Sequence, residues 1–244
     1  MLAHRGLVPH DAEGIVENSL AALAAAQAAG VPYVESDCHI TVDGVVVLFH
    51  DDDLSRVTGD PRPIRDVPVR ELEELMSTRG GLVTLAQAFD AFPTLRFNLD
   101  VKAEDAADPV GREVARHSER VLLTSFSDAR RRRALAAAAQ EGGDAATSAG
   151  TSTTARVVAA VASRSARLVR RALAGVDALQ VPERRGRVRI VTPRLIDAVH
   201  RAGAEVHVWT VNDPDDMRRL LDLGVDGLVT DRADVARDVV LARA

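Results

Sequence analysis

The sequence of 244 residues has little cysteine, few aromatic residues, no excess of basic charge and no long apolar run. Cys38 is the one cysteine, so no disulfide can form within the chain. No stretch approaches the roughly 18 apolar residues that a membrane-spanning helix needs. Lysine and arginine number 31 against 36 aspartate and glutamate residues, and the resulting net charge of −5 argues against a nucleic-acid-binding surface.

What the chain does have is enough apolar residues for a sizeable core. Hydrophobic residues make up 46% of it, although aromatic residues are only 3%. The length fits one large α/β barrel or two small domains, and no linker-like stretch divides it, so we expect a single domain over residues 1–244. Only Met1-Leu2-Ala3 precedes the first polar motif, which argues against a secretory signal and for a cytoplasmic protein. Whether residues precede Met1 is left open.

Short apolar runs alternate with helical patterns along the chain. Strands are predicted at 2–4, 33–40, 96–101, 121–126, 145–149, 178–181, 205–210 and 227–230. Helices are predicted at 20–29, 69–76, 84–91, 106–117, 128–140, 153–174, 193–202, 214–223 and 235–242. Strands that are each followed by a helix favour a parallel sheet, and this length is typical of a closed (β/α)8 TIM barrel. A doubly wound open sheet is the alternative, weakened because no glycine-rich dinucleotide turn follows the first strand.

One segment interrupts the alternation. Asp43-Gly44 separates two β-rich runs, which is a strong signal for a β-hairpin. A two-residue turn there pairs Val42 with Val45 and, continued along both strands, pairs Asp37 with His50. We therefore predict a short hairpin, inserted after the second strand, that carries His50 back to the acidic residues of that strand.

Acidic residues mark two of the predicted strands. Glu35 and Asp37 share one face of their strand, because side chains alternate with period two, and Asp100 lies on a later strand. Active sites of barrel enzymes lie at the carboxyl ends of the strands. Three carboxylates there could hold a hard divalent ion, Mg²⁺ or Ca²⁺, through oxygen. The alternatives are pairing of the carboxylates with arginines and, for the Asp100-Val101-Lys102 run, an ion pair between strands.

Two histidines and an arginine suit chemistry at a phosphate ester. His4 ends the first predicted strand, and a lone histidine there is more often structural than catalytic. With His50 it forms a pair, one member of which could take a proton while the other gives one. Arg5 offers a planar fork of donors for phosphate oxygens, and Gly6 permits a close backbone approach. The combination predicts metal-assisted cleavage of a phosphodiester.

Together these residues resemble the glycerophosphodiester phosphodiesterase family over nearly the whole chain. His4-Arg5-Gly6 followed by Glu17-Asn18-Ser19 matches the opening pattern of the family. Further matches, each weak alone but specific in their order and spacing, lie at residues 35–39, 41–44, 50–51, 124–126, 209–212 and 226–232.

The resemblance implies an eight-fold barrel that uses a divalent cation to hydrolyse glycerophosphodiesters to glycerol 3-phosphate and an alcohol. The partner would be a small-molecule glycerophosphodiester, without nucleic acid and without a membrane span. Ten residues receive a role by their motifs: acid–base catalysis by His4 and His50, phosphate binding by Arg5 and Lys102, metal ligation by Glu35, Asp37 and Asp100, a cleft wall at Trp209, and support of the phosphate site by Glu17 and Asn18. Asn18 is equally a candidate helix cap.

One departure from the family keeps two other functions open. The third metal ligand is usually glutamate, and here it is Asp100, as in related phospholipase D toxins that cleave sphingomyelin or lysolipids. The first alternative is therefore a lysolipid or sphingomyelin phosphodiesterase that forms a cyclic phosphate. The second is a non-catalytic barrel that only binds phosphoesters. The headgroup, the choice between Mg²⁺ and Ca²⁺, the attacking group and the oligomeric state are not determined by the sequence.

The remaining histidines and the cysteine carry weaker signals. His39 is in phase with Asp37 and could orient a ligand or be structural. Cys38 is expected to point away from the carboxylate face and to be packed. Four histidines without an evident partner are interpreted as structural: His10, His117, His200 and His207.

Overall fold

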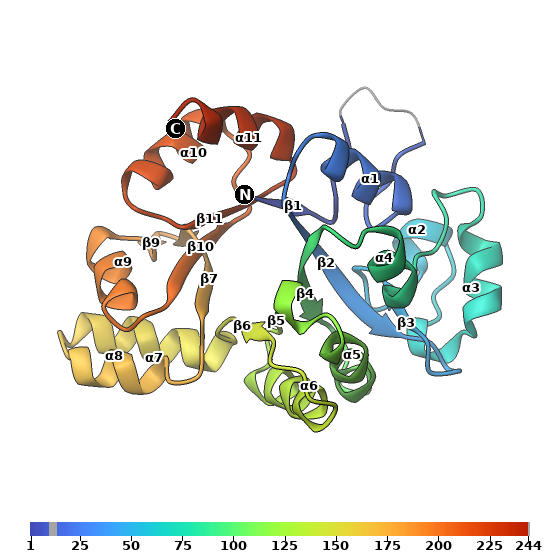
Figure 1. Ribbon diagram of the computed structural model, residues 1–244, viewed down its shortest axis with the longest axis horizontal. Helices are drawn as coiled ribbons and strands as arrows, with labels where there is room; N and C mark the ends of the chain where they lie inside the picture. The colour runs from blue at the N-terminus through green and yellow to red at the C-terminus, as the bar shows by residue number, and fades with distance from the viewer. Residues whose placement is uncertain (10–13, 244) are drawn as a thin grey trace.

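Eight parallel strands form the centre of the protein in a computed structural model that describes residues 1–9 and 14–243 (Figure 1). In chain order they are β1 (Leu2–His4), β2 (Tyr33–Ile40), β4 (Arg96–Val101), β5 (Val121–Thr124), β6 (Ala146–Thr147), β7 (Ala178–Pro182), β10 (Glu205–Trp209) and β11 (Gly227–Thr230). The order within the sheet is β6-β5-β4-β2-β1-β11-β10-β7, and every neighbouring pair in it is parallel.

The two edges of this sheet meet between β6 and β7. Ser148 and Ala178 form a parallel bridge, and the amide of Ala149 donates to the carbonyl of Ala178 at 2.9 Å. The amide of Asp177 donates to the carbonyl of Thr147, also at 2.9 Å. These bonds close the sheet, so the predicted (β/α)8 TIM barrel is confirmed.

Helices surround the barrel in Figure 1. They are α1 (Leu20–Ala28), α4 (Leu85–Ala91), α5 (Ala107–Ala115), α6 (Asp128–Gln140), α7 (Thr151–Ala162), α8 (Ala166–Ala172), α9 (Pro193–His200), α10 (Pro214–Asp222) and α11 (Ala233–Leu241). A side segment between the hairpin and α4 adds α2 (Ser55–Thr58), a 3-10 turn (Ile64–Asp66) and α3 (Val69–Met76), and a second 3-10 turn (Ser118–Arg120) precedes β5. Within the described part of the chain, no helix has the length and apolar character needed to cross a bilayer.

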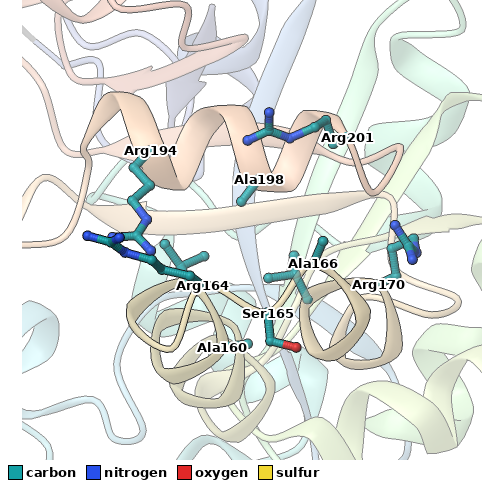
Figure 2. Close-up of a pocket in the computed structure, with 10 residues that line it drawn as sticks. Ala160, Arg164, Ser165, Ala166, Arg170, Arg194, Ala198 and Arg201 are labelled. Atoms are coloured by element: carbon teal, nitrogen blue, oxygen red, sulfur yellow. The ribbon is translucent and has the colours of Figure 1, made fainter.

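The single helix predicted at 153–174 is wrong, because the structure has two helices there. Arg164, at a φ of +59°, lies in the left-handed region just after α7. Ser165 then begins α8, since its hydroxyl accepts a hydrogen bond from the amide of Leu168 at 3.3 Å. Glycine is the usual residue at such a helix end, so the apolar periodicity of the sequence does not reveal the break. Figure 2 shows Arg164 beside a cleft between these helices and α9.

The hairpin exists, but its predicted register is wrong by one residue. β2 pairs antiparallel with β3 (Val46–Leu48), with Cys38 opposite Leu48. The amide of Thr41 donates to the carbonyl of Val45 at 3.0 Å, which leaves a three-residue loop rather than a two-residue turn. Gly44 ends the loop with a φ of +82°. An Asp-Gly pair is compatible with both loop lengths, and only the backbone geometry decides between them.

The corrected register changes the partner of Asp37. Its carbonyl accepts a hydrogen bond from the amide of Phe49 at 2.9 Å, so Phe49 and not His50 lies opposite it. In a continuous strand this shift would turn the His50 side chain to the other face. β3, however, ends at Leu48, and the chain beyond it leaves the ladder. His50 therefore still reaches the interior of the barrel mouth.

A second small hairpin, not predicted, follows β7. It consists of β8 (Arg184–Arg185) and β9 (Val188–Arg189), and Gly186 in its turn has a φ of +59°. Arg185 and Ile190 place this hairpin at the edge of the barrel cavity.

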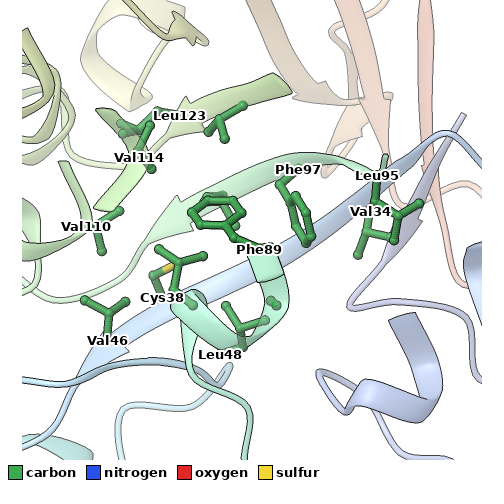
Figure 3. Packing of buried hydrophobic residues seen from close by; sticks show 14 of the residues in the cluster. Val34, Cys38, Val46, Leu48, Phe89, Leu95, Phe97, Val110, Val114 and Leu123 are labelled. Carbon is green, nitrogen blue, oxygen red and sulfur yellow. The ribbon is translucent and has the colours of Figure 1, made fainter. Parts of the chain in front are cut away.

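Cys38 packs as predicted, on the helix side of β2. It is fully buried among Val46, Leu48 and Phe89 (Figure 3). Burial raises the pKa of its thiol well above the usual value. A thiol in such surroundings is a packing group and not a nucleophile.

Candidate active site

A cavity of about 850 Å³ opens near the carboxyl ends of the barrel strands. Eight of the ten predicted site residues line it: His4, Arg5, Glu35, Asp37, His50, Asp100, Lys102 and Trp209. Glu17 and Asn18 are not on its surface and contact the residues that are.

Four oxygen-bearing side chains form two rows on neighbouring strands. β2 and β4 run parallel, with Glu35 opposite Asn98 and Asp37 opposite Asp100. The two-residue spacing turns all four into the cavity, where each is at most 8% exposed. Asn98 was not among the predicted residues, although its spacing of two from Asp100 is a signal that could have identified it.

Lys102 bridges the facing carboxylates of Asp37 and Asp100. Its ammonium lies 2.9 Å from Oδ1 of Asp37 and 2.8 Å from Oδ2 of Asp100. Burial alone would lower the pKa of Lys102, but the two carboxylates outweigh it and raise that pKa above its usual value. The ion pair between strands that the sequence left open is therefore present, as Lys102 with Asp37 of β2, and the same ammonium still faces the cavity.

Negative charge is in excess among these groups. Burial, followed by the charges of Asp37 and Asp100, raises the pKa of Glu35 well above its usual value. Burial also raises the pKa of Asp100, against the opposing effect of Lys102. The Oδ1 atoms of Asp100 and Asn98 are buried and receive no hydrogen bond from any described residue. An additional cation at this place would relieve both the repulsion and the missing partners.

The donor set fits a hard divalent ion. Carboxylate and amide oxygens are the ligands that Mg²⁺ and Ca²⁺ prefer, and Glu35, Asp100 and Asn98 present such oxygens on one face of two strands. Within the described residues, no three histidine, cysteine or acidic side chains already converge as a metal-binding group. The ammonium of Lys102 lies between two of the carboxylates that would do so.

The imidazole of His4 forms a hydrogen bond with the carboxylate of Asp231, which lies near the C-terminal end of the chain. Its Nδ1 lies 2.6 Å from Oδ1 of Asp231, while its Nε2 is 3.9 Å from Oε2 of Glu35. Asn212 donates to Oδ2 of Asp231 at 2.7 Å and accepts from its amide at 2.9 Å. The hydrogen bond with His4, together with that of Asn212, lowers the pKa of Asp231. Asp231 therefore fixes the orientation of the imidazole that faces the cavity.

His50 is held in the same way by its neighbour in sequence. Its Nδ1 lies 2.6 Å from Oδ1 of Asp51, and Nε of Arg56 donates to Oδ2 of Asp51 at 2.5 Å. Burial opposes ionisation of Asp51, but these two hydrogen bonds lower its pKa overall. Arg56 also pairs with Glu17, and Glu17 accepts from Arg5 at 2.8 Å. A continuous chain of contacts thus joins His50 to Arg5.

Asn18 supports the carboxylates and does not cap the helix. Its amide donates to Oδ2 of Asp37 at 3.5 Å, and its Oδ1 accepts from the hydroxyl of Ser36 at 2.6 Å. The cap of α1 is Ser19, whose hydroxyl accepts from the amide of Ala22. The cap interpretation of Asn18 is therefore wrong, and its support of the phosphate site stays a prediction.

The backbone at Arg5 and Gly6 lies in the left-handed region, with φ of +57° and +86°. The sequence indicated a close backbone approach at Gly6. The group that approaches its backbone is α1. A Cβ there would lie 2.7 Å from Cβ of Ala22 and 2.9 Å from its carbonyl carbon. The close approach positions Arg5, whose amide donates to Oε2 of Glu35 at 3.2 Å.

Replacing Gly6 by alanine is expected to lower the free energy of unfolding by roughly 2–4 kcal/mol, because it adds a steric clash to a strained backbone. Urea unfolding measures the change. Gly44→Ala is the matched control, since Gly44 has a φ of +82° but a Cβ added to it would meet no atom within 4 Å. Equal destabilisation of the two variants would show that the contact with Ala22 is unimportant.

An apolar wall faces the charged rows. Trp209 lines the cavity and packs edge to face on Phe126, with ring centroids 5.8 Å apart. The wall continues along α7 through Ala155 and Val158 to Ile190 beyond the second hairpin. The cavity therefore joins a polar end suited to phosphate with an apolar extension.

The other histidines that the structure describes lie outside the cavity lining. His39 is buried, with its Nε2 3.8 Å from Oδ1 of Asp52, and burial lowers its pKa. His200 and His207 have acidic partners that the sequence did not reveal, Asp226 at 2.7 Å and Glu205 at 2.9 Å. The ring of His117 packs against Phe89. His10 lies outside the described residues.

The sequence model of the Glycerophosphoryl diester phosphodiesterase family matches residues 4–235. The chain belongs to this family. It is 37% identical over 248 residues to the probable glycerophosphodiester phosphodiesterase 2 of Mycobacterium tuberculosis. The aligned region covers 99% of this chain and 90% of that protein. A glycerophosphodiester phosphodiesterase of Thermotoga maritima shares the fold with a TM-score of 0.71 and 26% identity, over 98% of this chain and 96% of that one. A phosphodiesterase of Oleispira antarctica, solved with its product sn-glycerol-3-phosphate, shares the fold with a TM-score of 0.72 and 23% identity, over 98% of this chain and 95% of that one.

Proposed function

We propose that this chain hydrolyses glycerophosphodiesters to glycerol 3-phosphate and an alcohol. The observation that carries the proposal is the pair of histidines, His4 and His50, each held at Nδ1 by an aspartate and each lining one cavity with Arg5 and Lys102. Membership of the family supports it, as do the activity named for the Mycobacterium tuberculosis relative and the product bound by the Oleispira antarctica relative.

The two histidines are the proposed acid–base pair. One imidazole accepts a proton from the attacking oxygen, that of water or of a neighbouring glycerol hydroxyl, as this oxygen forms a new bond to phosphorus. In the second case a water then opens the cyclic phosphate to give glycerol 3-phosphate. The other imidazole, initially protonated, gives its proton to the leaving oxygen as the phosphorus–oxygen bond to that alcohol breaks. Asp231 and Asp51 orient the two rings, because each carboxylate bonds to Nδ1.

Arg5 and Lys102 supply positive charge to the phosphate. Both face the cavity, and both are already positioned by acidic partners, Arg5 by Glu17 and Lys102 by Asp37 and Asp100. A guanidinium and an ammonium fixed in advance stabilise charge that grows on the phosphoryl oxygens during attack. Trp209 would border the same substrate on its apolar side.

The proposed metal ligands are Glu35, Asp37 and Asp100, with Oδ1 of Asn98 beside them. When bound, a divalent cation neutralises charge on the phosphoryl group and orients the substrate. Asp100 is one methylene shorter than the glutamate usual in the family, which favours an additional water ligand or a contribution from Asn98.

An enzyme-coupled assay of glycerol 3-phosphate tests the function. We expect release from glycerophosphocholine or another member of a headgroup panel with Mg²⁺ or Ca²⁺, loss of release with EDTA, and recovery when the ion is restored. If the folded protein released no glycerol 3-phosphate from any glycerophosphodiester with either ion, the substrate assignment would be refuted.

A second candidate is cleavage of a lysolipid with formation of a cyclic phosphate. The apolar extension of the cavity along α7 favours it, since the extension could hold a single aliphatic chain beyond the phosphate. Phosphorus NMR with lysophosphatidylcholine separates the candidates: a cyclic phosphodiester as the end product would support this one, and unchanged lysolipid would reject it.

A further inference from the structure

A second cleft, of about 420 Å³, lies in the helical layer between α7, α8 and α9 (Figure 2). Its floor is apolar and made of small side chains, among them Ala160, Val169 and Ala198. The helix α7 separates it from the barrel cavity, because Ala159 of α7 lines the cavity and Ala160 lines the cleft. Nothing in the proposed reaction uses this cleft.

Four arginines surround the cleft. Figure 2 shows Arg164 and Arg194 at one end and Arg170 and Arg201 at the other. Arg201 lies 3.7 Å from Asp197, while the side chains of the other three make no ion pair or hydrogen bond within the described part of the chain. The four guanidinium groups are exposed and have one acidic partner among them, so they form a locally positive patch on a protein of net charge −5.

Arg164 occupies a position where the backbone prefers glycine. Its φ is +59°, its amide donates to the carbonyl of Val161 at 3.1 Å, and the amide of Ser165 donates to the carbonyl of Ala160 at 3.2 Å. These bonds form the glycine-favouring end of a helix. An arginine there is unfavourable for the backbone, and the location of its side chain at the cleft offers a reason for its presence.

We propose that this cleft binds a phosphate ester with an aliphatic body. Guanidinium groups bind phosphate oxygens in a bidentate manner, and two arginines at each end can neutralise a phosphate monoester. The alanine and valine floor contains no aromatic ring on which a nucleobase could stack, and it matches a short alkyl chain. The ester could be soluble or borne by a lipid, and the charge and the apolar body are common to both.

Calorimetric titration with n-hexyl phosphate in EDTA tests the site. For the wild-type chain we expect binding that is at least tenfold tighter than that of inorganic phosphate, and for Arg164→Gly and Arg194→Gln a loss of at least tenfold in affinity or of one binding equivalent. Arg164→Gly also removes an unfavourable residue from the helix end, so its melting temperature should not fall. Arg167→Gln is the control, because Arg167 is exposed on α8 but does not line the cleft.

Vesicles of phosphatidylcholine with and without phosphatidic acid distinguish the source. Cosedimentation that depends on phosphatidic acid and on Arg164 assigns a lipid-borne ester, whereas hexyl phosphate binding without cosedimentation assigns a soluble one. Binding of hexyl phosphate with the same affinity and stoichiometry by the wild type, Arg164→Gly and Arg194→Gln, or no binding of either probe, would overturn the proposal.

Discussion

Replacement of His50 by alanine is expected to lower kcat for glycerophosphodiester hydrolysis by roughly 10²–10⁴-fold, and replacement of His4 by a similar factor. Each variant leaves the phosphate-binding and acidic groups of the cavity in place but removes one proton acceptor or donor. Because the two histidines act in one step, the double variant should lose little more than either single variant. Steady-state kinetics with folding checked by circular dichroism measures these effects.

The matched control is His200→Ala. The imidazole of His200 also bonds to an aspartate, Asp226 at 2.7 Å, but it does not line the cavity. We expect this variant to keep the wild-type rate. Unchanged rates in both His4→Ala and His50→Ala would contradict the acid–base assignment and would favour a barrel that binds phosphoesters without cleaving them.

Replacement of Asp100 by asparagine is expected to weaken the binding of Mg²⁺ or Ca²⁺ by roughly tenfold or more and to abolish metal-stimulated activity. The change removes one negative charge from the oxygen-rich rows on β2 and β4. In the absence of the ion the same change removes repulsion from Glu35 and Asp37 together with the pairing to Lys102. Melting temperature measured against ion concentration reports binding independently of activity.

Asp100→Glu is the conservative control, since it restores the side chain that is usual in the family and keeps the charge. It should retain the stabilisation by the ion that Asp100→Asn loses. If Asp100→Asn showed the same ion-dependent rise in melting temperature as the wild type, Asp100 would not be a ligand, and the donor set would have to be reassigned.

Local patterns in the sequence were sufficient for most of the barrel. The bounds of β1, β2, β4 and β11 agree with the predicted ranges, because each strand is a short run whose pattern differs from that of the neighbouring helices. The helix predicted at 153–174 failed because Arg164 takes a conformation normally reserved for glycine. The hairpin register failed because Asp-Gly suits two loop lengths, and packing and backbone hydrogen bonds, not propensity, choose between them.

The site was predictable where its residues share one strand. Glu35 and Asp37 follow from a spacing of two, and Asn98 could have been added by the same rule from Asp100. The groups that hold the histidines could not be found in this way. Asp231 is 227 positions from His4 and meets it only because β11 pairs with β1 when the barrel closes.

Arg56 shows the same limit at shorter range. It belongs to the side segment that packs around Leu54 and Ile64, and only that packing brings it to both Asp51 and Glu17. No periodicity in the sequence connects Arg56 with the motifs that carry the chemistry. Its contribution becomes visible once the tertiary contacts are known.

Phosphorus NMR of glycerophosphocholine incubated with the protein and Mg²⁺ or Ca²⁺ shows whether the two histidines of the barrel cavity catalyse hydrolysis of a glycerophosphodiester. We expect the phosphodiester signal to give way to that of glycerol 3-phosphate with the wild-type protein, and to persist when His4 and His50 are both alanine. A diester signal that is unchanged by the folded wild-type protein, or a cyclic phosphate as the final product, would contradict this expectation.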